Sequence, residues 1–81
     1  MINIKILFFG MTSDLVHKTE LSIPLKENAI VKDFKIALVE QFPTLKNMDS
    51  YAIAVNESYA TDEVFLKNGD VVAIIPPVSG G

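Results

Sequence analysis

Cysteine is absent from this chain of 81 residues, and histidine occurs only once, at His17. Without cysteine there is no disulfide, no thiolate metal ligand and no cysteine nucleophile. No nucleophile or metal ligand stands near His17 in the sequence, so a role for it as a general base is disfavoured. The four glycines are isolated or terminal and form no phosphate-binding loop. We therefore expect no metal site and no active site inside the domain.

Long hydrophobic runs are also missing, although 49% of the residues are apolar. The longest runs, "IKILFFGM" and "VVAIIPPV", fall well short of the roughly 20 residues that span a bilayer. No signal-peptide pattern opens the chain. The net charge of −3 comes without any basic stripe that would suit nucleic acid. We expect a soluble, cytoplasmic domain that binds neither membrane nor nucleic acid.

The chain has the length of one small domain, and at this size a single core is marginally stable. Alternating apolar residues predict strands at 2–9, 19–25, 51–55 and 71–75, with a short strand around Tyr59. Pro24 lacks a backbone donor, so the second strand is expected at an edge of the sheet. "LKNGD" predicts a turn in which Gly69 takes a positive φ.

One long helical pattern, "AIVKDFKIALVEQF", occupies 29–42. Asn28 is its nearest capping residue, and Pro43 is expected to end it. A single helical turn is expected at 11–17, capped by Thr12 or Ser13. The order of elements predicts an α+β fold, with a mixed sheet of about five strands packed on one main helix and the last strand beside the first.

The first and last strands are apolar on both faces. In the first strand Leu7 and Phe9 alternate with the residues that face the helix, and Ile75 does the same in the last strand. One helix covers one face, so we expect Leu7, Phe9 and Ile75, together with Tyr59, to form an exposed apolar patch of the kind that binds partners. The alternative is that the loop at 43–50 folds over these residues and buries them.

The stretch "IPPVSGG" ends the sequence. Pro76 and Pro77 fix φ and remove two backbone donors, so they end the sheet and stiffen the start of the tail. Gly80 and Gly81 carry no Cβ and fit a channel too narrow for other residues. We interpret 1–75 as the domain and 76–81 as a flexible tail whose Gly81 carboxylate another enzyme converts to an acyl adenylate. The alternative is an idle, frayed end.

Several stretches match a known family: "ILFFG", "AIVKDFKIAL", "AVNESYA" and, most specifically, "GDVVAIIPPVSGG". The chain resembles the small subunit of molybdopterin synthase, in the ubiquitin-like sulfur-carrier family with the β-grasp fold. The resemblance spans nearly the whole chain. It departs at Ile30, where the family usually has Thr or Ser at the start of the helix.

The resemblance implies a sulfur carrier that is not an enzyme on its own and holds no cofactor. A ubiquitin-activating-like adenylyltransferase would use ATP to adenylate Gly81, and a sulfur donor would convert it to a thiocarboxylate. The tail would then enter the large subunit of a heterotetrameric molybdopterin synthase and deliver sulfur to the pterin dithiolene. Carried over by position, the partner-binding residues are those of the apolar patch and the tail: Leu7, Phe9, Tyr59, Ile75, Pro76, Pro77, Val78 and Ser79, with Gly80 preceding the reactive Gly81.

Three other functions remain open. The first is a sulfur carrier for thiazole synthesis in the thiamin pathway, the second is a ubiquitin-like protein modifier, and the third is an interaction module whose tail has no chemistry.

Overall fold

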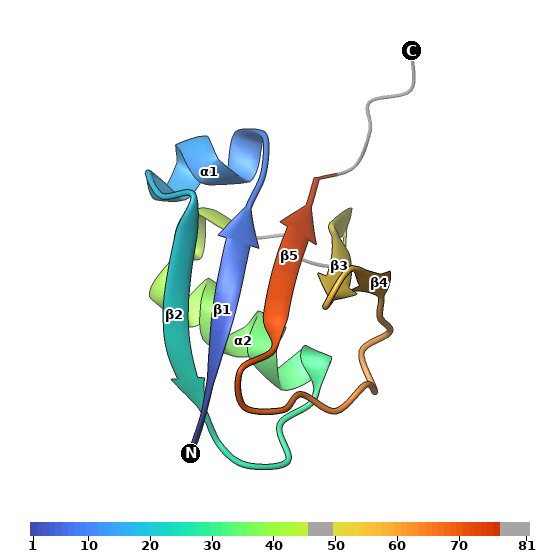
Figure 1. Cartoon of the computed structure of the whole chain (residues 1–81). Helices are drawn as coiled ribbons and strands as arrows, with labels where there is room; N and C mark the ends of the chain where they lie inside the picture. Colours follow the sequence, from blue (N-terminus) through green and yellow to red (C-terminus); the bar gives the residue numbers. More distant parts are fainter. Residues whose placement is uncertain (46–49, 77–81) are drawn as a thin grey trace.

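The computed structural model describes residues 1–45 and 50–76. Five strands form one sheet in the order β2-β1-β5-β3-β4, and α2 lies across one face of it (Figure 1). The elements in chain order are β1 (Ile2–Phe8), α1 (Met11–Val16), β2 (Glu20–Leu25), α2 (Val31–Gln41), the 3₁₀ turn η1 (Pro43–Leu45), β3 (Ala52–Val55), β4 (Ser58–Tyr59) and β5 (Val71–Ile75). This is the mixed sheet on one main helix that the sequence predicts, in the β-grasp arrangement.

Strand pairing brings the first and last strands together at the centre of the sheet. β1 pairs antiparallel with β2 and parallel with β5, and β5 pairs antiparallel with β3. The predicted pairing of the first and last strands is confirmed. β2 is an edge strand, which is where Pro24 is tolerated because it has no N–H to donate.

The core lies between the sheet and α2. Alternate residues of β1 and β5 face the helix, including Ile6 and Ile74, which are fully buried. Phe34 and Leu38 of α2 are equally buried, one helical turn apart. The ring of Phe8 packs edge-on against that of Phe42, with centroids 6.2 Å apart. One face of the sheet is therefore filled by one helix.

The start of α2 differs from the prediction. Ile30 occupies the N-cap position, and its backbone N–H donates to Asp33 Oδ2 at 3.0 Å. Asn28 instead adopts a left-handed conformation with φ of 67° in the preceding turn, so its prediction as the cap was wrong. This bond is one half of a capping box, in which the N3 side chain accepts from the N-cap backbone N–H. Ile30 has no side-chain acceptor to make the other half. Helix α2 ends at Gln41, before Pro43, as expected.

α1 is a short helix rather than a single turn, and its caps also differ from the prediction. Gly10 is the N-cap residue, and no side chain caps this end. The hydroxyls of Thr12 and Ser13 donate backward to the carbonyls of Phe9 and Gly10. His17 ends the helix in a left-handed conformation and is exposed.

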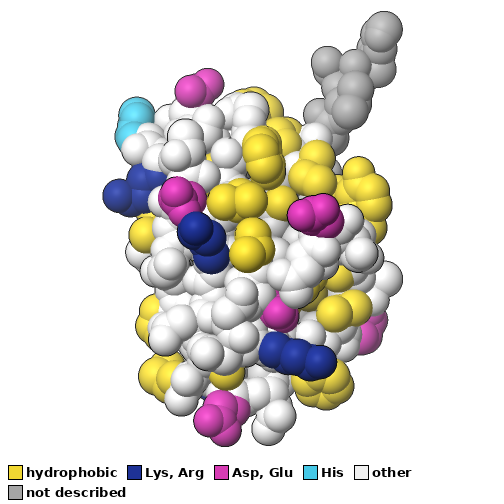
Figure 2. Space-filling view, viewed as in Figure 1, with side chains coloured by type: hydrophobic (Ala, Val, Ile, Leu, Met, Phe, Trp, Pro, Cys, Tyr) yellow, Lys and Arg dark blue, Asp and Glu magenta, His cyan; other side chains and the backbone are white. Residues whose placement is uncertain are grey.

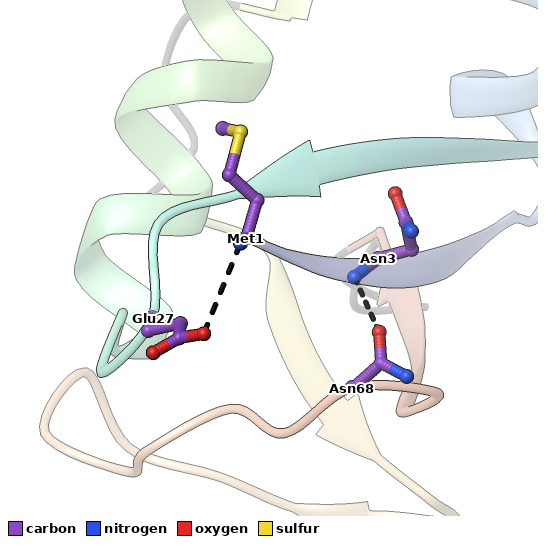
Figure 3. Close-up of polar contacts among 4 residues, drawn as sticks. All are labelled: Met1, Asn3, Glu27 and Asn68. Atoms are coloured by element: carbon purple, nitrogen blue, oxygen red, sulfur yellow. Dashed lines mark hydrogen bonds and ion pairs between the residues drawn. The ribbon is translucent and has the colours of Figure 1, made fainter.

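Polar contacts attach the loop before β5 to the beginning of β1 (Figure 3). The backbone N–H of Asn3 donates to Asn68 Oδ1, and the N–H of Gly69 donates to the carbonyl of Asn3, both at 2.8 Å. Gly69 has the predicted positive φ, at 89°. The amino group of Met1 also lies 3.9 Å from Glu27 Oε1, an exposed pair of small energetic value. These bonds fix where β5 begins relative to β1.

Replacing Gly69 with alanine tests this turn. We expect Gly69→Ala to lower the free energy of unfolding by about 1 kcal/mol, because a Cβ disfavours the left-handed conformation. Urea unfolding measures the change. The neighbouring exposed substitution Lys67→Ala serves as the control and should stay within about 0.5 kcal/mol of the native chain. Equal effects of the two substitutions would show that the conformation of Gly69 does not matter.

Candidate functional site

The face of the sheet opposite α2 carries a continuous apolar row. Leu7 of β1 lies opposite Ala73 of β5, Ala73 opposite Ala54 of β3, and Ala54 opposite Tyr59 of β4. Ile75 and Ala52 face each other in the next row toward the tail. Except for Tyr59 these residues are at least partly buried, yet none belongs to the core cluster under α2. They form a second apolar surface, which no helix covers in the described part of the chain.

The predicted members of this surface differ in exposure. Phe9 is 49% exposed and Tyr59 is 76% exposed, whereas Leu7 and Ile75 are partly buried. Ala54, between Leu7 and Tyr59, is only 7% exposed. Larger side chains therefore surround a recessed area formed by the alanines, which we name the alanine floor. In Figure 2, hydrophobic side chains gather on the upper part of this face, beside the start of the tail.

The alternative, in which the loop at 43–50 covers these residues, is not supported by the described part of that loop. η1 contacts α1 and α2, and Leu45 is fully buried in the core cluster on the helix side of the sheet. Residues 46–49 lie outside the described residues. Phe9 and Tyr59 are exposed with η1 in this position.

Charged side chains limit the apolar surface. Lys5 and Glu20 share the face with Leu7. Lys5 is two residues before Leu7 in β1, and Glu20 of β2 lies directly opposite Leu7. Lys5 Nζ is 2.9 Å from Glu20 Oε2, with both side chains about half exposed. On the β1 side the apolar area is thus confined to the carboxyl end of the strand. We name Leu7, Phe9, Tyr59, Ile75 and the three alanines at 52, 54 and 73 the docking face.

The tail begins at the edge of the docking face. Pro76 is half-buried, and a Cβ on Gly10 would lie 3.4 Å from Pro76 Cγ. Gly10 has a φ of 56° and a ψ of −133°, a conformation that side chains rarely adopt. Glycine is favoured here by the backbone conformation, since a Cβ 3.4 Å from Pro76 Cγ would be in ordinary van der Waals contact. Pro77, Val78, Ser79, Gly80 and Gly81 lie outside the described residues, so their roles and the division into 1–75 and 76–81 stay predictions.

Sequence analysis missed Gly10 and the three alanines of the docking face. The alternation of β5 already placed Ala73 on the same face as Ile75. The alanines of β3 could be placed on this face only once the pairing register of β3 with β5 was known. The periodicity of a short apolar strand does not reveal that register. The proximity of Gly10 to Pro76 joins residues 66 positions apart and has no local signal.

One ion pair away from the docking face is partly buried, since the side chain of Lys35 is only 14% exposed. Lys35 Nζ is 2.7 Å from Asp62 Oδ1, which supports the loop that crosses the start of α2. Over residues 1–45 and 50–76, no group of three or more His, Asp or Glu side chains is placed to hold a metal ion. In the same ranges no helix is long and apolar enough to cross a membrane.

A family model described as the ThiS family matches residues 6–81, nearly the whole chain. The chain belongs to the ThiS family. Its curated relatives include a molybdopterin synthase sulfur carrier subunit from Caenorhabditis elegans. The two sequences are 36% identical over 84 residues, and the match covers 100% of each chain.

Solved structures agree with the family assignment. A Pyrococcus furiosus protein assigned as molybdopterin converting factor, subunit 1, superposes with a TM-score of 0.88 at 30% identity, covering 96% of this chain and all of that one. A chain from the complex of subunits 1 and 2 of the Helicobacter pylori molybdopterin-converting factor superposes with a TM-score of 0.70 at 27% identity, covering 99% of this chain and all of that one. The chain is thus similar in sequence and fold to small subunits named for molybdopterin synthesis.

Proposed function

We propose that this protein is the sulfur-carrier subunit of a molybdopterin synthase. The observation that carries the proposal is the position of the docking face. The docking face lies where β5 passes into the tail. The chain also matches the Caenorhabditis elegans subunit of that name over the full length of both sequences. In this account the folded domain binds partners and the tail carries the sulfur, so the subunit itself catalyses no reaction.

The proposed chemistry takes place at Gly81. An adenylyltransferase joins the Gly81 carboxylate to the α-phosphate of ATP and releases pyrophosphate, which gives the poor carboxylate electrophile a leaving group. The outer sulfur of a donor persulfide then attacks the acyl carbon, forming a C–S bond as the C–O bond to AMP breaks. A thiol next attacks the donor's sulfur and breaks the S–S bond, which leaves a disulfide on the donor and the transferred sulfur on the acyl carbon. The product is a thiocarboxylate, which delivers its sulfur to the pterin in the large subunit. The match to the family extends through residue 81 and supports this assignment.

The composition of the tail suits insertion into a partner. Consecutive prolines favour an extended backbone. Gly80 and Gly81 present no side chain to the walls of a narrow channel. The apolar docking face then anchors the domain beside the mouth of that channel. Burial of apolar area at about 25 cal/mol per Å² is the expected driving force for this contact.

The large subunit is the proposed occupant of the docking face. The Helicobacter pylori neighbour is described as a protein–protein complex of the two subunits, and its small subunit shares this fold. The adenylyltransferase and the sulfur donor are proposed partners on the grounds of the chemistry alone. A thiazole-pathway carrier and a protein modifier would use the same activated Gly81, so partner identity separates them. The relatives named for molybdopterin synthesis favour the pterin pathway.

Intact mass tests the chemistry of the tail. After incubation with the organism's activating enzyme, ATP and a sulfur donor, we expect the mass to rise by the difference between one sulfur and one oxygen atom. The chain lacking Gly81 should show no increase. Subsequent addition of the large subunit and the pterin precursor should return the mass to its starting value. An unchanged mass for the native chain would refute the carrier function.

Binding to the large subunit tests the docking face. We expect Phe9→Asp and Tyr59→Asp each to weaken binding at least about tenfold, because a buried carboxylate without a partner is costly. Ile36→Asp is the matched control, since Ile36 is 53% exposed but lies on α2, and it should leave the affinity unchanged. Calorimetric titration measures the affinities. If Phe9→Asp and Tyr59→Asp unfold the domain, or if Ile36→Asp weakens binding equally, the docking face is wrongly assigned.

A further inference from the structure

The turn between β3 and β4 is bonded to the beginning of β5. The backbone N–H of Asn56 donates to the carbonyl of Val71 at 2.8 Å, and Asn56 Oδ1 accepts from the N–H of Val71 at 3.0 Å. Asn56 Nδ2 donates to Asp70 Oδ1 at 2.9 Å. Asp70 Oδ2 in turn accepts from the backbone N–H of Lys67 at 2.8 Å. We name the side-chain contacts of Asn56 and Asp70 the clasp.

The clasp joins the two parts of the docking face. On one side is the β3–β4 hairpin, which carries Tyr59, and on the other is β5, which continues into the tail. β4 has two residues and pairs only with β3, and the Tyr59 side chain is largely exposed, so the hairpin end gains little from packing. Asn56 and Glu57 both have positive φ, at 50° and 73°, which gives the turn a defined shape. Asn56 ties this turn to β5.

We propose that the clasp is a positioning element for partner binding. By fixing the hairpin on β5, it holds Tyr59 in its row beside Ala54 and thereby sets the affinity for the large subunit. Asn56 and Asp70 act through Tyr59 rather than by contacting the partner. The inference rests on the proposed function for the identity of the partner, while the clasp itself rests on the contacts above.

One substitution breaks the clasp with almost no change in shape. Asn56→Asp keeps the oxygen that accepts from Val71 and tolerates a left-handed conformation. It removes the Nδ2 donor and places a second carboxylate against Asp70. The double variant Asn56→Asp/Asp70→Asn exchanges the two side chains, so the bond between them re-forms with donor and acceptor reversed. The backbone N–H groups of Val71 and Lys67 still donate to an oxygen at positions 56 and 70. Asn68→Asp is the matched control, because it adds the same charge while keeping the oxygen that accepts from Asn3.

Affinity for the large subunit is measured at a temperature where every variant is folded. We expect Asn56→Asp to weaken binding about two- to tenfold, the usual value of one hydrogen bond. The double variant and Asn68→Asp should bind within about twofold of the native chain. In a Tyr59→Ala background Asn56→Asp should have no further effect, because the clasp acts through that side chain. An effect that persists without Tyr59, or that the double variant does not reverse, overturns the proposal.

Amide hydrogen exchange separates failure of the clasp from failure of the proposed function. The N–H of Ala60 donates to the carbonyl of Ile53 at 2.9 Å and reports opening of the hairpin. Its exchange should be faster in Asn56→Asp and return to the native rate in the double variant. If the native chain does not bind the large subunit but this pattern is seen, the proposed function fails and the clasp stands. An unchanged exchange rate overturns the clasp whichever partner binds.

Discussion

The parallel pairing of β1 with β5 is the constraint on which the rest of the structure depends. Parallel strands end at the same edge of a sheet, so the carboxyl ends of β1 and β5 lie together. Leu7, Ile75 and the first tail residue Pro76 consequently meet at one place. Gly10, in the turn after β1, lies beside Pro76, and its positive φ favours glycine at this position. The chain therefore leaves the sheet at its apolar end, where Pro76 is half-buried.

A single helix explains why this end is apolar and uncovered. Strands at the centre of a mixed sheet tend to be apolar on both faces. Here α2 buries one face of β1 and β5. The other face carries Leu7, Ala73 and Ile75, and no helix among the described residues covers them. The unpaired edges are blunted in ordinary ways, with Pro24 and the Lys5–Glu20 pair on the β2 side and a two-residue β4 on the other. The apolar surface is thus directed toward face-on binding rather than strand addition.

Much of this could be predicted from the sequence. Alternation identified the strands and the two-faced apolar pattern of β1 and β5, and the proline positions gave the edge strand and the end of α2. Asn28 was wrongly chosen as a helix cap because the N-cap position is occupied by the apolar Ile30, which a search for polar N-cap side chains passes over. The alanine floor and the clasp depend on cross-strand register and on contacts between residues 14 and 15 positions apart, which no local pattern encodes. The chemistry of Gly81 was predicted from the sequence and the family resemblance, and it remains a prediction.

The central claim is that the face opposite α2, together with the tail, is the surface that a partner binds. Nuclear magnetic resonance titration of the labelled domain with the large subunit tests it most directly. The account predicts shift changes in the row from Leu7 to Tyr59, at Ile75 and through residues 76–81, with the exposed side of α2 around Ile36 unaffected. Changes centred on α2, with the row and the tail unperturbed, would contradict it.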